Sequence, residues 1–207
     1  MNIWIERIVN KPIDSNSYVI WKKDSNQCVV VDPGSEDSGE LINFFDKNQL
    51  VPEYIILTHE HFDHIWGVNK LKDLYNPKIV CSFECASHII DAKKNLSLFF
   101  NQIGFETYQA DLAIESIHNR LHWNNTTIEF IKTLGHSQGS ISFYIENNLF
   151  CGDLMIKGHK TITKLPGGNK HQLKESINNI FSEFCHSKTI VFSGHGDIFT
   201  LYQFLNT

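Results

Sequence analysis

The sequence contains no long hydrophobic run and no cluster of basic residues. Its first residues read MNIWIERIVNK, where charged side chains interrupt the apolar ones. An export signal or a membrane-spanning helix needs a continuous apolar segment, so we expect neither. The formal net charge is −5. Because nucleic-acid binding requires grouped Lys and Arg side chains, we expect no nucleic-acid partner and no membrane partner.

Cysteine is sparse, and its spacing does not indicate a disulfide framework. The chain of 207 residues has 5 cysteines, an odd number, and they are mostly far apart. We interpret them as buried free thiols in a protein of the reducing cytoplasm. They are Cys28, Cys81, Cys85, Cys151 and Cys185.

Low-complexity segments and linkers rich in Gly, Pro or Ser are also absent, so we expect one domain over residues 1–207. With 42% hydrophobic residues, this domain can bury a core. Runs rich in β-branched and aromatic residues alternate with amphipathic segments, which predicts an α/β layered domain. We expect strands at 3–9, 17–21, 27–31, 53–58, 76–82, 126–134, 140–146, 148–153 and 189–194, and helices at 35–49, 66–75, 86–94, 96–103 and 169–184.

Two segments of the chain resemble each other. Residues 16–34 and 139–153 each read as a strand, a polar turn, a second strand and then an Asp. Chance similarity of two hairpins is one interpretation. The other is that the domain has two related halves, with Asp32 and Asp153 at corresponding strand ends that face a shared site.

Histidine is abundant, at 11 residues, and three of these lie in the hexapeptide HEHFDH directly after the strand at 53–58. Packing does not explain this density of imidazoles at a strand-to-helix junction. Residues two apart in an extended turn point the same way, so His59 and His61 can bind one ion. Asp63 and His64, in the following helical turn, would face a second position. The sequence therefore predicts a metal site.

Further nitrogen and oxygen ligands follow three other strands. They are His136, Asp153 and His195, each beside a glycine. The segment GHSQG around His136 also fits G-x-S-x-G, which would make Ser137 a nucleophile. That motif requires a helix after the turn, whereas a strand-like run, SISFYIEN, follows here. We therefore favour His136 as a metal ligand and Ser137 as a turn residue.

This ordered pattern, from VVVDPG to SGHG, resembles the metallo-β-lactamase superfamily. The resemblance implies a four-layer αβ/βα sandwich, with two mixed β-sheets flanked by helices. It also implies two divalent ions, with Zn²⁺ preferred and Fe or Mn as alternatives. Metal 1 would bind His59, His61 and His136, and metal 2 would bind Asp63, His64 and His195, with Asp153 bridging.

Within the superfamily, the chain resembles the glyoxalase II-like branch, the hydroxyacylglutathione hydrolases. The resemblance rests on a histidine at the last ligand position and on the lack of an export signal. This implies hydrolysis of a small acyl thioester, such as a glutathione conjugate, by a metal-bridging hydroxide. Asp63 and Asp153 would be catalytic, in that they orient the water and offset the metal charge. Asp32 is either a hydrogen-bond partner of a ligand histidine or only a turn residue before Pro-Gly.

Substrate contacts are predicted in the segment that follows Asp153. Lys157, His159 and Lys160 would attract an anionic thioester, although a solvated basic loop is the other interpretation. The chain departs from the family where Thr161-Ile162-Thr163-Lys164 replaces the usual Gly-Arg-Thr-Asp. Because 12 residues follow His195, we expect no C-terminal helical substrate domain. The alternative functions are a lactonase, another ester or amide hydrolase, or a persulfide dioxygenase with one iron.

Overall fold

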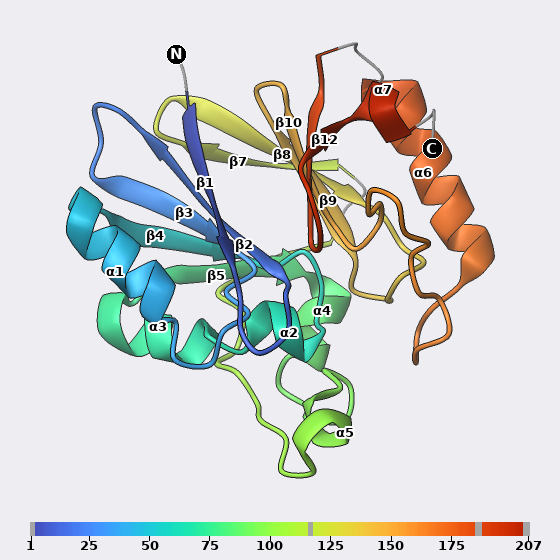
Figure 1. Ribbon diagram of the computed structural model, residues 1–207, viewed down its shortest axis with the longest axis horizontal. Helices are drawn as coiled ribbons and strands as arrows, with labels where there is room; N and C mark the ends of the chain where they lie inside the picture. Colours follow the sequence, from blue (N-terminus) through green and yellow to red (C-terminus); the bar gives the residue numbers. More distant parts are fainter. Residues whose placement is uncertain (1–2, 116–117, 185–187, 205–207) are drawn as a thin grey trace.

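The computed structural model describes residues 3–115, 118–184 and 188–204, which form two six-stranded sheets (Figure 1). The first sheet has the order β1-β2-β3-β4-β5-β6, and the second has the order β12-β11-β10-β9-β8-β7. Strands of the first sheet are β1 (Ile3–Val9), β2 (Asn16–Lys22), β3 (Gln27–Val31), β4 (Val51–Ile56), β5 (Lys78–Ser82) and β6 (Leu112–Ile114). Strands of the second are β7 (His118–Trp123), β8 (Thr126–Lys132), β9 (Ile141–Ile145), β10 (Asn148–Gly152), β11 (Ile190–Ser193) and β12 (Phe199–Thr200).

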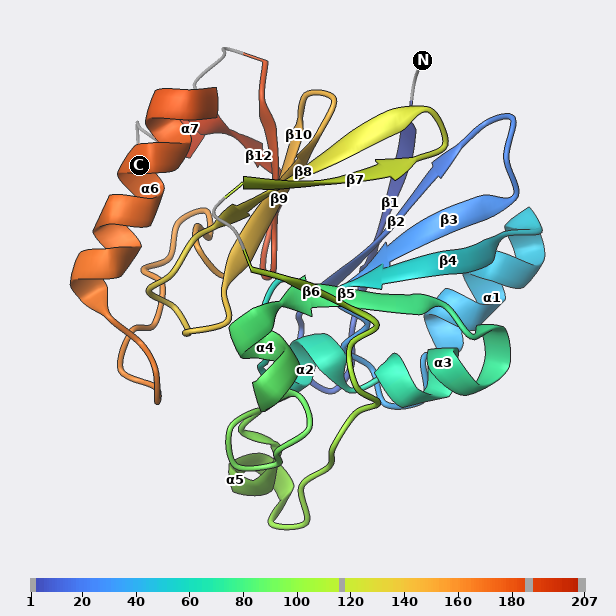
Figure 2. The ribbon, with the colours of Figure 1, turned by 180° about the vertical axis from the view of Figure 1, so that it is seen from behind.

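Helices cover the outer face of each sheet, so the layers follow the predicted αβ/βα order (Figures 1 and 2). Both sheets contain parallel and antiparallel pairs, which confirms the predicted fold class. On the first sheet lie α1 (Gly39–Asn48), α2 (Phe62–Ile65), α3 (Val68–Tyr75) and α4 (Phe83–His88), and α5 (Ser97–Asn101) lies farther out, beyond α2 and α4 (Figures 1 and 2). On the second lie α6 (Lys170–Phe184) and α7 (Leu201–Phe204).

Strand β3 shows why its sequence is apolar without interruption. Val29 and Val31 point into the core between the sheets, while Cys28 and Val30 point into the core under α1 and α3. Successive side chains of a strand face opposite sides, so a strand covered on both faces needs apolar residues throughout. A third core fills the space between the second sheet and α6 and α7.

Aromatic rings join the two sheets at the centre of the sandwich. Phe150 stacks on Phe143 with ring centroids 4.6 Å apart and on Phe192 at 4.7 Å. Tyr18, from the opposite sheet, meets Phe150 edge-on at 5.4 Å. These offset and edge-to-face geometries are the favoured arrangements of aromatic pairs. The core thus fixes how the two sheets face each other, and with it the edge that they share.

The two halves of the chain repeat one connection. In the first half, β2 and β3 pair antiparallel, α1 follows, and β4 then pairs parallel to β3. In the second half, β9 and β10 pair antiparallel, α6 follows, and β11 pairs parallel to β10. The similarity of residues 16–34 and 139–153 therefore corresponds to a shared topology. The carboxyl ends of the parallel strands β3, β4, β10 and β11 meet at one edge, whereas β2 and β9 run in the opposite direction.

The predicted helices at 86–94 and 96–103 were wrong in their bounds, because α4 ends at His88 and α5 covers only 97–101. Buried Asn95 explains the break: its Oδ1 accepts a hydrogen bond from the Ser97 N–H at 2.9 Å, and Leu96 has φ 69°. A left-handed residue cannot continue a right-handed helix. The short strands β6, β7 and β12 were not predicted.

Cys28, Cys81, Cys85 and Cys151 are buried and free, as predicted. Cys185 lies outside the described residues, as does His186. A search of the described helices found none with both the length and the apolar composition needed to cross a bilayer.

Replacement of the central ring tests the core between the sheets. We expect Phe150→Ala to lower the free energy of unfolding by about 3–5 kcal/mol, because the cavity cannot collapse between two stacked rings. Urea denaturation followed by circular dichroism measures it. Leu74→Ala on α3 is the control, since the Leu74 side chain is 51% exposed. Equal effects of the two substitutions would contradict this account of the core.

Candidate metal centre

The loop after β4 places four polar side chains at the shared edge of the sheets. His61 has extended backbone angles, φ −64° and ψ 142°, and α2 begins at the next residue. The turn into α2 separates Asp63 and His64 from the two histidines before them. His59, His61 and His64 are at most 5% exposed, although apolar core residues surround them on the sheet side. Buried imidazoles at this density require partners.

A first group consists of His59, His61 and His136. Each offers a ring nitrogen, and these nitrogens lie within 4.8 Å of one another. The His136 Nε2 and His61 Nδ1 atoms are 2.9 Å apart. The structure thus brings His136, from the turn between β8 and β9, against the loop after β4.

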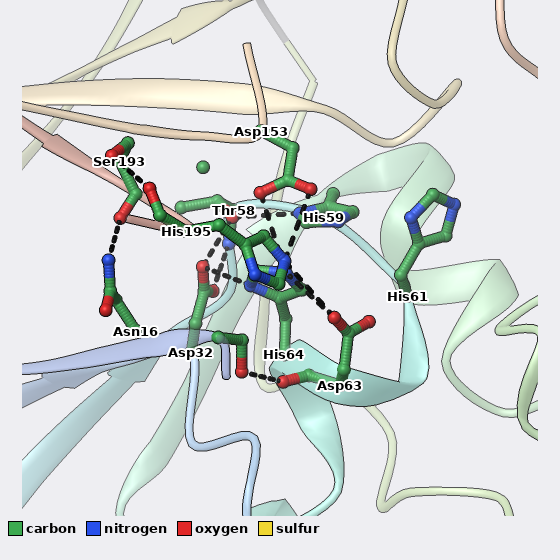
Figure 3. A network of polar contacts seen from close by, with 12 residues as sticks. Asn16, Asp32, Thr58, His59, His61, Asp63, His64, Asp153, Ser193 and His195 are labelled. Carbon is green, nitrogen blue, oxygen red and sulfur yellow. Dashed lines mark hydrogen bonds and ion pairs between the residues drawn. The ribbon is translucent and has the colours of Figure 1, made fainter. Parts of the chain in front are cut away.

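A second group consists of Asp63, His64 and His195, whose candidate ligand atoms also lie within 4.8 Å of one another. The His64 and His195 Nε2 atoms are 3.3 Å apart, and Asp63 Oδ2 lies 3.3 Å from His195 Nε2. Asp153 stands between the groups. Its Oδ1 is 3.6 Å from His64 Nε2 (Figure 3). Its Oδ2 is 3.5 Å from His136 Nε2.

The remaining ring nitrogens are held by fixed acceptors. His136 Nδ1 donates to the Ile162 carbonyl at 2.9 Å, and His195 Nδ1 donates to the Asp14 carbonyl at 3.0 Å. His64 Nδ1 donates to Asp32 Oδ2 at 3.1 Å. Since these acceptors have no proton to give, each ring must carry its hydrogen on Nδ1. The Nε2 atom of each ring is therefore the one left to face the centre, where it can offer a lone pair to a metal once any proton on it is released.

Asp32 is a hydrogen-bond partner of a ligand histidine and not only a turn residue. Besides His64, its carboxylate accepts bonds from the Thr58 N–H at 2.8 Å and the Thr58 hydroxyl at 2.6 Å. The Thr58 oxygen in turn lies 3.0 Å from His59 Nδ1. One buried carboxylate thus orients residues of both groups, as Figure 3 shows.

The segment around His195 is held by the first sheet. The Asn16 side chain, at the start of β2, donates to the Ser193 carbonyl at 3.0 Å and to the Gly196 carbonyl at 2.9 Å. Gly194 leaves no room for a side chain, because a Cβ atom there would lie 2.2 Å from Asp153 Oδ1. Close approach of the backbone is therefore a condition for placing Asp153 beside His195.

Two buried atoms at the centre have no hydrogen-bond partner among the described residues: His59 Nε2 and Asp153 Oδ1. An unpaired buried polar atom costs about 1–3 kcal/mol, so both atoms call for a ligand. The donor set of imidazole nitrogens and carboxylate oxygens suits Zn²⁺, Fe and Mn. The residues present fit a pair of divalent ions, one at each group.

The two groups differ in charge. Burial lowers the pKa of His59 well below its usual value and that of His61 to about 4, and neighbouring imidazoles add to this effect. Burial would also lower the pKa of His64, but the carboxylates of Asp63, Asp153 and Asp32 raise it to about 10. Without metal, His64 of the second group therefore holds a proton at neutral pH, whereas His59 and His61 of the first group are neutral.

Glu60, a residue of the loop after β4, is 3% exposed and makes contacts that the sequence does not predict. Its carboxylate accepts the Ser137 hydroxyl at 2.8 Å and lies 3.0 Å from His88 Nδ1. Ser137 is fully buried and β9 follows its turn, so the strand–turn–strand interpretation is confirmed. No local pattern could reveal this cluster, because its members are 28 to 77 residues apart.

The predicted substrate residues lie on the loop after β10. Lys157 is partly exposed, and His159 and Lys160 are exposed. Within the described residues, no hydrogen bond or ion pair links these side chains to the metal ligands. Their role therefore stays a prediction.

Comparisons with known proteins agree with this geometry. The model of the metallo-beta-lactamase superfamily matches residues 10–195. The probable metallo-hydrolase YqgX of Bacillus subtilis is 33% identical over 188 residues, which cover 89% of this chain and 86% of that protein. Hydroxyacylglutathione hydrolase 1 of Vibrio vulnificus is 33% identical over 144 residues, or 70% of this chain and 49% of that protein. The BLEG-1 B3 metallo-beta-lactamase structure has a TM-score of 0.91 and 31% identity, with 99% of this chain and 97% of that chain covered.

Metal affinity should depend on pH differently at the two groups. Binding at the second group displaces the His64 proton, so its observed affinity should rise about tenfold per pH unit for each proton released, up to the pKa of about 10. His59 and His61 need no deprotonation at neutral pH. Chelator competition at several pH values measures the metal affinity of each group. Equal pH slopes for the two ions would contradict this assignment.

Asp32→Asn should lower the affinity of the second group for its metal ion by about 10–100-fold. The new amide N–H₂ would occupy the position of Oδ2 and donate to His64 Nδ1, which would move the imidazole proton to Nε2. That nitrogen would then have no lone pair for a metal. Asp37→Asn, at an exposed residue of the same connection, is the control. Unchanged affinity in Asp32→Asn, measured by calorimetry, would exclude this role.

Proposed function

The chain belongs to the metallo-beta-lactamase superfamily, and on this premise we propose that it is a dinuclear metal-dependent hydrolase of acyl thioesters. The observation that carries the proposal is the convergence of seven nitrogen and oxygen donors, from four loops, at one buried edge. A bound pair of divalent ions would supply a Lewis acid and a water activated at neutral pH. We take Zn²⁺ as the first candidate metal.

The chain's own residues account for how the metals would be held. Asp153 lies between the groups and, with Asp63, would balance the charge of two ions and orient a water between them. Asp32, Ile162 and Asp14 fix the ring orientation of His64, His136 and His195 through the hydrogen bonds described above. Such acceptors keep each ligand lone pair aimed at its metal.

Relatives support the reaction class. The chain is 33% identical to a hydroxyacylglutathione hydrolase, although it spans about half of that protein's length. A metal-activated water needs no side-chain nucleophile. The Ser137 hydroxyl is buried and donates to Glu60. We propose a small acyl thioester as substrate, with glutathione as the candidate thiol and Lys157, His159 and Lys160 as its contacts. The four free cysteines support a reducing compartment, and we place the protein in the cytoplasm.

Hydrolysis of another acyl derivative is the second candidate. The match to the BLEG-1 B3 metallo-beta-lactamase covers nearly the whole chain, which favours amide hydrolysis as the alternative, and lactone hydrolysis would need the same metal-activated water. A persulfide dioxygenase with one iron fits less well. One ion would use only part of the donor set and leave further buried donors without a partner.

His61→Ala should abolish most thioester turnover, with a loss of more than about 100-fold, because it removes a donor of the first group. The assay is a panel of S-D-lactoylglutathione, other thioesters, lactones and a β-lactam on metal-loaded protein, with metal content measured in parallel. Turnover of lactones or the β-lactam alone would select the second candidate.

Ser137→Ala is the matched control, because it alters the neighbour of a ligand without removing a metal donor. We expect lower thermal stability from the lost bond to Glu60, but thioester turnover within a few-fold of the unsubstituted protein. Loss of turnover with both metals still bound would make Ser137 a nucleophile and overturn the proposed chemistry.

A further inference from the structure

An apolar groove of about 410 Å³ lies next to the candidate metal centre and is open to solvent. Its size falls in the range of small-molecule sites. None of its lining side chains is charged, and the whole set is Phe62, Leu96, Phe99, Phe100, Leu165 and Pro166. Phe99 is 70% exposed and Leu165 is 37% exposed. Exposed apolar surface of this kind calls for an occupant.

One wall of the groove begins in the ligand loop itself. Phe62 stands between His61 and Asp63, and its ring stacks on Phe100 of α5 with centroids 4.5 Å apart. Its N–H donates to the Asn95 carbonyl at 2.9 Å. A group bound against this wall therefore contacts a residue adjacent to two candidate metal ligands.

The segment that carries α5 extends away from the sheets, beyond α2 and α4 (Figure 2), yet it is well braced. The Asn95 amide donates to the Phe105 carbonyl at 2.8 Å, and the Phe105 N–H donates to Ser97 Oγ at 2.9 Å. Trp66 packs between Phe100 and Phe105, at 5.5 Å and 5.7 Å. The wall is thus formed before any ligand binds, which lowers the entropy cost of binding.

The opposite wall is connected to His136, another candidate ligand of the first group. Leu165 and Pro166 follow Ile162, whose carbonyl accepts the His136 Nδ1 hydrogen. The Asn169 N–H donates to the Gly135 carbonyl at 2.8 Å, so the same turn is also held from behind. The two walls therefore lead to His61 and His136, whose ring nitrogens are 2.9 Å apart.

We propose that this groove binds an apolar acyl group of the substrate, an alkyl chain of medium length or an aromatic ring. The inference rests on the proposed thioester hydrolysis and narrows its substrate class. A lactoyl group is small and polar and would leave the groove empty. An anionic thiol such as glutathione has no partner among its uncharged side chains, whereas Lys157 and Lys160 stand on the exposed loop after β10. The acyl group is thus the half that matches the groove.

The test is a series of S-acyl glutathiones from acetyl to octanoyl, with lactoyl included, on the metal-loaded protein. Burial of one methylene contributes about 0.8 kcal/mol, so kcat/KM should rise about fourfold per added methylene until the groove is filled. A second series varies the alkyl thiol at a constant acetyl group and should be flat. Length dependence in the thiol series alone would overturn the assignment of the acyl group.

Two substitutions, one on each wall, locate the effect. Phe99→Ser and Leu165→Ser should each lower kcat/KM for the octanoyl substrate about tenfold or more and leave the acetyl substrate within about twofold. Ile103→Ser is the control, since Ile103 is 83% exposed on the same segment but does not line the groove. Equal losses on both substrates, or a flat acyl series with acetyl turned over, would overturn the proposal.

Calorimetry with octanoate and acetate separates this inference from the proposed reaction. If no thioester is hydrolysed, the proposed function fails. Tighter binding of octanoate than of acetate, lost in Phe99→Ser, would still support the groove. No preference for octanoate would overturn it. Sedimentation of the unsubstituted protein and of Phe99→Ser tests whether a second copy of the chain occupies the groove. If the unsubstituted protein is a dimer that binds no octanoate, and Phe99→Ser is a monomer, the groove is a subunit contact and the proposal is overturned.

Discussion

The burial of polar side chains, the candidate metal ligands, beside an apolar core is the constraint on which the site depends. Imidazoles and carboxylates that are nearly inaccessible to water must each find a partner, and the fold supplies one acceptor for each outer nitrogen of His64, His136 and His195. The inner atoms are left for cations. Among the residues that the structure describes, His59 Nε2 and Asp153 Oδ1 have no hydrogen-bond partner. The protein thus satisfies every outer atom so that the inner ones stay available.

The repeated connection in the two halves explains why the ligands meet at one edge. In each half an antiparallel pair is followed by a helix and by a parallel strand, so four carboxyl ends point the same way. Asp32 follows β3 and Asp153 follows β10, and both carboxylates face His64 from opposite sides. One Asp orients the imidazole and the other lies at the metal position. The halves have similar topology but different tasks.

The same loops also determine what lies beside the metals. The ligand loop contributes Phe62 to an apolar wall, and the turn that orients His136 continues into Leu165 and Pro166. Positions that orient the ligands and positions that would contact the acyl group are therefore neighbours along the chain. Variation of the side chains beside Ile162 can change the substrate without disturbing His136, because the bond to that ring comes from the Ile162 backbone carbonyl.

The sequence by itself determined the order of the main elements, the fold class and the ordered set of candidate ligands, because apolar patterning and the spacing of HEHFDH are local properties of the chain. The bounds around Asn95 needed side-chain contacts that no periodicity records. Tertiary structure alone decided that Asp32 orients His64, that Glu60 joins Ser137 to His88, and that Phe62 and Leu165 face one groove. These residues are far apart in sequence: the strand order of the first sheet brings Asp32 to His64 and Glu60 to His88, and the packing of the two halves adds Ser137 and Leu165.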